Sequence, residues 1–132
     1  MRDNLFNFLQ SIGFTLLIEE ESEYFGDYYC VFRYTTIELR LISTRSNIFV
    51  EIRKAFSNEN WYDLAIIKAL LSKENAINYI LELDECRLFL EKYLLDIELL
   101  FDDQKYLTTK DELEILSLNK SKQMFPNLFQ QK

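Results

Sequence analysis

The chain has 132 residues, an apolar fraction of 48%, two glycines and one proline, which fits one globular domain over residues 1–132 without a flexible linker. Its formal net charge is −7, with 9 acids and 6 bases in residues 1–60 and 13 acids and 9 bases in residues 61–132. Nucleic acids and anionic membranes are bound through clustered lysine and arginine, so this acidic balance speaks against both kinds of partner.

The first expected element is a short amphipathic helix over residues 3–12. Apolar residues recur at helical spacing from Leu5 to Ile12, Asp3 can cap the start, and Gly13 supplies the stop. The beginning of the chain lacks the pattern of a signal peptide, and no apolar run is long enough to span a membrane, so we expect a cytoplasmic protein.

An acidic run follows an alternating apolar segment that is expected to enter a sheet. It consists of Glu19, Glu20, Glu21 and Glu23, with Asp27 close behind and no base among them. The run is either a solvated loop that keeps the protein soluble or an electrostatic docking patch for a basic partner protein. Such a patch would speed encounter and set specificity more than it would raise affinity.

Three further segments up to residue 54 are rich in β-branched and aromatic residues or alternate between apolar and polar residues. They are 28–34, 37–43 and 48–53. The connections between them are too short for anything but tight turns, which requires antiparallel pairing. We therefore expect an antiparallel meander of three to four strands over about residues 14–54, with one face on a core.

The other face of this meander is a second candidate surface for binding a partner. The side chains expected there are Arg33, Arg40, Arg53, Glu38, Glu51, Tyr29, Ile42 and Phe49. Exposed aromatic residues and arginines are the types favoured at protein interfaces. The purely structural interpretation is a cross-strand ladder of ion pairs, each of which contributes little.

The second half of the chain is expected to be helical, in four segments. They are about 61–71, 74–82, 84–102 and 110–122. Asn60 and Asp84 can act as N-caps, and Thr109 to Glu112 has the spacing of a capping box. Trp61 is expected in the core, and the alternative is a half-exposed anchor. Strands grouped before helices predict an α+β domain, in which the antiparallel sheet packs against the C-terminal helices.

The residue types that most catalytic sites need are scarce or missing. The chain has no histidine, which removes the commonest general base and the commonest metal ligand. Two cysteines cannot complete a tetrahedral zinc site, and two glycines cannot form the usual phosphate-binding loops. We therefore assign no catalytic, cofactor-binding or metal-binding residue, and expect no cofactor and no small-molecule substrate.

Two pairs of residues leave some chemistry open. Acids are plentiful, and Asp102 and Asp103 could belong to a paired-acid or magnesium site, although a solvated helix end explains them more simply. Cys30 and Cys86 both have apolar neighbours and are expected to be buried thiols, with a disulfide between them as the alternative.

Three stretches in the middle of the chain, roughly residues 14–72, carry a resemblance to a known group of proteins. They are Tyr24-Phe25-Gly26-Asp27-Tyr28-Tyr29, Ser43-Thr44-Arg45-Ser46 and Trp61-Tyr62-Asp63-Leu64. With them the chain resembles small bacterial immunity proteins of polymorphic-toxin systems. The resemblance implies a cytosolic, acidic, non-enzymatic protein that neutralises a toxin by occluding its active site. Because such proteins vary widely, the resemblance transfers no binding residue to this chain.

The sequence therefore favours a binding protein whose partner is another protein, most specifically a toxin domain. The candidate contact residues come from the acidic run and from the outer sheet face, and they are Glu19, Glu20, Glu21, Glu23, Asp27, Arg40, Phe49 and Arg53. Two other classes stay open, namely a small carboxylate-dependent hydrolase and a structural or adaptor subunit of a larger phage or defence assembly.

Overall fold

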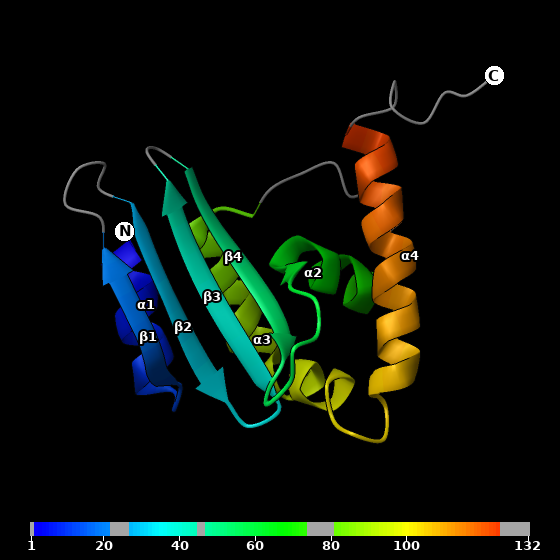
Figure 1. Ribbon diagram of the computed structural model, residues 1–132, viewed down its shortest axis with the longest axis horizontal. Coiled ribbons are helices and arrows are strands. Elements are labelled where there is room, and N and C mark those ends of the chain that lie inside the picture. The colour runs from blue at the N-terminus through cyan, green and yellow to red at the C-terminus, as the bar shows by residue number, and fades with distance from the viewer. Residues whose placement is uncertain (1, 22–26, 45–46, 74–80, 125–132) are drawn as a thin grey trace.

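One antiparallel sheet and four helices make up the part of the chain that the computed structural model describes, residues 2–21, 27–44, 47–73 and 81–124 (Figure 1). The elements in chain order are α1 (Arg2–Ser11), β1 (Thr15–Glu21), β2 (Tyr28–Tyr34), β3 (Ile37–Thr44), β4 (Asn47–Lys54), β5 (Tyr62–Asp63), α2 (Leu64–Ser72), α3 (Leu83–Leu100) and α4 (Tyr106–Met124). This arrangement confirms the predicted α+β class.

The sheet follows the order of the chain, β1-β2-β3-β4-β5, and every neighbouring pair is antiparallel. The turn from β2 to β3 is tight, and Thr35 takes a left-handed backbone there (φ 47°). β1 forms one edge of the sheet and carries a bulge between Leu16 and Ile18. The two-residue β5 adds a fifth strand beyond the predicted meander.

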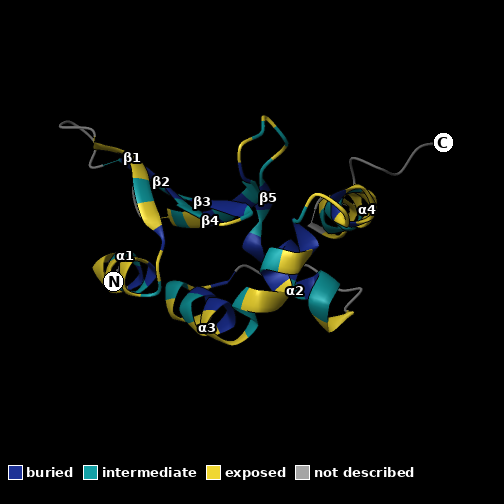
Figure 2. Ribbon diagram, turned by 90° about the horizontal axis from the view of Figure 1, so that it is seen from below, coloured by how far each residue is buried: buried dark blue, intermediate teal, exposed yellow. Residues whose placement is uncertain are grey.

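One face of the sheet is covered by α1, α2 and α3, which lie together on the same side of it (Figure 2). The strands turn large apolar side chains toward these helices, and Phe32, Leu39 and Ile52 from three neighbouring strands are completely buried. Their cross-strand pairing places them in one row across the sheet. This alternation of buried and outward residues is the pattern expected of an antiparallel sheet with one covered face.

α4 stands beside the sheet rather than beneath it and packs against α2 (Figure 1). Polar contacts fix it to the end of the sheet where β5 lies. The Tyr62 hydroxyl donates to Glu114, and the Lys120 ammonium lies 3.3 Å from the Asp63 carboxylate. The half-buried side chain of Glu59 pairs with Lys110 at 3.0 Å.

The helix after Trp61 begins later than predicted, because the chain first joins the sheet. Tyr62 and Asp63 pair with β4, so Asn60 does not act as the cap. Asp63 takes that role instead, and its carboxylate accepts a hydrogen bond of 2.9 Å from the Ala65 N–H.

The starts of the last two helices also differ from the prediction. α3 is capped by Glu82 rather than Asp84, and Glu85 completes a capping box with it. α4 begins at Tyr106, so Thr109 lies inside the helix, fully buried, and cannot cap it. Of the predicted helix 74–82, residues 74–80 lie outside the described residues, and Leu81 and Glu82 precede α3 without being helical.

Candidate functional site

The face of the sheet opposite α1, α2 and α3 is the candidate binding face. Within the described residues no helix covers it, and Figure 2 shows only the connection from β4 to β5 rising on that side. Two rows of outward side chains cross the strands, as the register shows. They are Arg33–Glu38–Arg53 and Tyr29–Ile42–Phe49. The face therefore contains an ionic part and an apolar part, with Arg40 and Glu51 between them.

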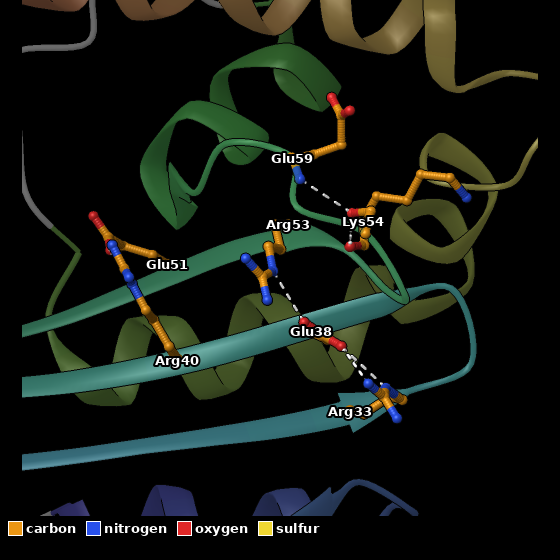
Figure 3. Close-up of polar contacts among 8 residues, drawn as sticks. Arg33, Glu38, Arg40, Glu51, Arg53, Lys54 and Glu59 are labelled. Atoms are coloured by element: carbon orange, nitrogen blue, oxygen red, sulfur yellow. Dashed lines mark hydrogen bonds and ion pairs between the residues drawn. The ribbon is translucent and has the colours of Figure 1, made fainter. Parts of the chain in front are cut away.

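Glu38 is the centre of the ionic part and is 3% exposed although no described helix lies over it. Its carboxylate accepts two hydrogen bonds from Arg33, at 2.7 and 3.0 Å, and one of 3.0 Å from Arg53 on the other neighbouring strand (Figure 3). Figure 3 also shows these side chains on the opposite side of the strands from α3. The charge of Glu38 is thus bound from both sides.

The balance of two effects sets the charge state of Glu38. Burial favours the neutral acid, but the hydrogen bonds from Arg33 and Arg53, together with the Phe56 backbone N–H, hold the pKa of this carboxyl below its ordinary value of 4.5. Phe56 has a left-handed backbone (φ 58°), which turns the chain back over the sheet at this point. Glu38 is therefore ionised at neutral pH and fully compensated.

Two aromatic rings cover the arginines of this region. The Arg33 guanidinium lies 3.9 Å from the centre of the Phe56 ring. The guanidinium groups of Arg40 and Arg53 lie 4.6 and 4.4 Å from the centre of the Trp61 ring. Trp61 is half-buried on this outer face, so the expectation that it belongs to the core was wrong. The Trp61 ring packs against the guanidinium groups of Arg40 and Arg53 instead of against apolar core residues.

Arg40 also pairs with Glu51 across β3 and β4 at 2.6 Å. We call Arg33, Glu38, Arg40, Glu51 and Arg53, with Phe56 and Trp61 above them, the closed cluster. Two of the predicted contact residues, Arg40 and Arg53, belong to it. Their guanidinium groups are already engaged by carboxylates and by Trp61, so in this structure they hold the connection from β4 to β5 against the sheet.

The apolar part of the face has a different character. Tyr29, Ile42 and Phe49 lie in one row across β2, β3 and β4, and Glu20 of β1 pairs with Tyr29 to extend the row. Phe49 is 37% exposed, and Tyr29 and Ile42 are half-buried. We call Glu20, Tyr29, Ile42 and Phe49 the open strip, because no described segment lies across it.

A shallow hollow of about 360 Å³ opens at the β1 end of the open strip. Its lining includes Tyr29 and Ile42 of the strip together with the acids Glu20, Glu21 and Asp27. The structure thus places three of the predicted acidic contact residues beside the apolar row. A cationic side chain with an apolar stem would match this combination of ring, aliphatic surface and carboxylates.

The remaining predicted acids lie elsewhere. Glu19 pairs with Cys30, and its carboxylate accepts a hydrogen bond of 2.7 Å from the Tyr28 hydroxyl. Burial and this carboxylate together raise the pKa of Tyr28 above its ordinary range. Glu19 is therefore separated from Glu20 by the alternation of the strand, and Glu23 lies outside the described residues.

The residues that left chemistry open show structural roles. Asp103 is exposed and pairs with Lys54 at 2.6 Å, whereas Asp102 accepts a hydrogen bond of 2.8 Å from the Lys105 N–H. Cys30 and Cys86 are both buried and form no disulfide, and burial raises the pKa of the Cys86 thiol to about 12. Among the described residues, no three cysteine, aspartate or glutamate side chains gather closely enough to hold a metal ion.

The sequence pointed to Phe49 and to the acids of the hollow, but it did not indicate Phe56, and Trp61 was assigned to the core. Both rings follow β4 in a polar segment without a regular period, so only the path of the backbone reveals what they cover. No helix in the described ranges is both long enough and apolar enough to cross a bilayer. Comparison of the chain with protein families, with curated proteins and with solved structures finds no match.

Proposed function

We propose that this protein is a non-enzymatic immunity protein, which neutralises a cognate toxin domain by binding it through the open strip and the adjoining acidic hollow. The observation that carries the proposal is the pairing of a partly exposed apolar row, Tyr29–Ile42–Phe49, with carboxylates on a sheet face that no described helix covers. Aromatic anchors and charged neighbours are what protein interfaces typically combine.

The chemistry of the surface favours a basic partner. Glu20, Glu21 and Asp27 line the hollow, and the chain as a whole carries a net charge of −7. An enzyme that acts on an anionic substrate presents basic side chains around its active site. An acidic protein that binds those side chains is attracted over a distance and excludes the substrate at the same time.

Co-expression with the protein encoded beside this gene tests the proposal directly. We expect a one-to-one complex and protection of the host cell from the neighbour's toxicity. If the two proteins neither form a complex nor confer protection, the proposed function is wrong.

Surface variants then test where the partner binds. We expect Phe49→Ser and Glu20→Lys each to weaken the complex by about tenfold or more, because one removes an aromatic anchor and the other reverses a charge at the hollow. Glu91→Lys makes the same charge reversal on α3, on the opposite side of the sheet, and serves as the matched control. If all three variants bind the partner as tightly as the wild type, the immunity function stands, but the open strip and the hollow are not the binding surface.

A second function, that of an adaptor subunit, is favoured by one observation on α3. The helix exposes Leu88, Leu95 and Leu99, which follow one another at helical spacing on the side away from the sheet. Such a stripe is typical of a helix that docks into a larger assembly. A complex that is lost in Leu95→Lys but intact in Phe49→Ser would favour the adaptor over the immunity protein.

A further inference from the structure

α4 is apolar on two opposite sides. One side, with Tyr106 and Leu113, is buried in the domain. The other side exposes Leu107, Ile115 and Leu118, whose side chains are 77%, 61% and 49% accessible. A helix at the surface of a monomer usually carries charged and polar residues on its outer side. An exposed apolar side, such as this second one, is typical of a surface that binds another molecule.

Two of these residues, Ile115 and Leu118, belong to a stripe with the spacing of a coiled-coil seam. Asp111, Ile115, Leu118 and Lys122 follow one another at intervals of four, three and four residues, and all four are exposed. Residues with this spacing form one narrow stripe along a helix, which is the part that meets a partner helix in a two-stranded coiled coil.

The opposite charges at the two ends of the seam, Asp111 and Lys122, favour a second copy of this chain as the binding partner. In an antiparallel pair of α4 helices, with the two-fold axis midway between Ile115 and Leu118, each Ile115 faces Leu118 of the other copy. The same register places each Asp111 opposite Lys122 of the other copy. The seam thus matches itself in the positions of its apolar residues and of its charges, as the interface of a two-fold dimer must.

We propose that this protein forms a weak homodimer in which α4 pairs with α4 of a second copy in the antiparallel sense. The seam has two apolar layers and two ion pairs and is smaller than a standard interface, so association requires high protein concentration. The dimer leaves the candidate binding face accessible, because α4 lies at the β5 end of the sheet and the acidic hollow at the β1 end (Figure 1).

The stripe on α3 does not pair with itself in the same way. Tyr93 interrupts that helix with a non-helical backbone (φ −117°, ψ 17°), which breaks the continuity of the stripe. In the corresponding antiparallel register Leu88 would face Leu99, but the ammonium of Lys92 would face Leu95. Of the two exposed stripes, the one on α4 is therefore the one that fits a second copy.

Sedimentation equilibrium of the full chain tests the dimer. We expect the average mass to rise with concentration from 15.9 kDa toward twice that value. Asp111→Lys and Lys122→Asp should each weaken association by about tenfold or more, because each places like charges opposite one another twice. Circular dichroism of each variant confirms that the fold is retained.

Mixing the two charge variants tests whether Asp111 and Lys122 of different copies face each other. Asp111→Lys and Lys122→Asp chains together restore opposite charges at both ends of the seam, so we expect a heterodimer where neither variant associates alone. Ile115→Ala with Leu118→Ala should abolish association, whereas Leu95→Ala with Leu99→Ala on α3 should leave it unchanged. A wild-type chain that stays at 15.9 kDa, a mixture that stays monomeric, or equal weakening by the α3 pair would each overturn the proposal.

Discussion

The closed cluster and the open strip lie side by side on the same strands, yet they use the same kinds of residue in opposite ways. In the closed cluster, Glu38 is held by two arginines, and aromatic rings lie over the guanidinium groups. In the open strip, Phe49 and Glu20 lie on the outward face without a covering segment among the described residues. Residue type alone therefore does not identify a binding surface. What distinguishes the two regions is whether the chain returns to cover them.

The returning segment is the connection from β4 to β5. It passes over one half of the face because Phe56 takes a left-handed backbone and Tyr62 pairs back with β4. The half that it covers is held by ion pairs and stacked rings, and the half that it leaves uncovered is the part of the face through which we propose that a partner binds. Substitutions in the covered half should consequently lower the free energy of unfolding, whereas substitutions in the uncovered half should weaken partner binding.

The largest effect is expected from Glu38→Gln in the closed cluster. The substitution removes a buried charge while its two arginine partners stay, so we expect a loss of about 3 kcal/mol in the free energy of unfolding. Urea denaturation followed by circular dichroism measures this difference. A loss as small as that of a surface variant would show that the cluster contributes no more than exposed ion pairs do.

The stabilisation by Glu38 should also depend on pH in a defined direction. Because its pKa is lower in the folded protein than its ordinary value of 4.5, its contribution is complete above about that pH. It is lost as the pH falls through the lower, folded pKa. Denaturation series from neutral pH into acid should therefore show the wild type and Glu38→Gln converging at low pH, and curves that stay parallel would contradict this assignment.

A smaller effect is expected from Trp61→Ala. The ring stacks on Arg40 and Arg53, and its removal exposes both guanidinium groups and loosens the connection above them. We expect a loss of about 2 kcal/mol in unfolding free energy. Trp61 is the single tryptophan of the chain, so its fluorescence cannot follow the variant, and circular dichroism is the appropriate probe.

The smallest effect on stability is expected from Phe49→Ala in the open strip. This ring is partly exposed and has no cation stacked on it in the described structure, so the cost should be about 0.5–1 kcal/mol. The same substitution should have a large effect on partner binding, measured by titration calorimetry. If the variant loses stability but keeps full affinity for the partner, Phe49 stabilises the fold as the closed cluster does and is not a binding residue.

Much of the sheet could be predicted because its sequence signals are local. Alternation from Ile37 to Thr44 and from Asn47 to Lys54, joined by a short connection, requires an antiparallel pair with a defined inner face. The outward position of Arg40 and Phe49 follows from the same alternation. The pairing of β3 with β4 and the outward position of these two residues depend only on residues that are close in the sequence, so the sequence alone predicts them.

The helix starts and the closed cluster depend on longer-range contacts. Asn60 has the right chemistry for a cap, but pairing of Tyr62 with Ile52 moves the start of the helix to Leu64. Likewise, Thr109 has the spacing of a capping box, yet the helix begins one turn earlier at Tyr106, whose hydroxyl donates a hydrogen bond of 3.1 Å to the distant Glu59. In each case a tertiary contact overrides a favourable local signal.

β1 has a consequence for how the protein behaves when it is concentrated or acidified. An edge strand offers its backbone to any other extended chain, and β1 is long and exposed. Its three consecutive glutamates, Glu19 to Glu21, keep identical strands apart by mutual repulsion, and the bulge at Leu16 and Ile18 disturbs the flat geometry that stacking needs. In strong acid the repulsion disappears, so the same edge becomes the place where aggregation into fibrils would begin.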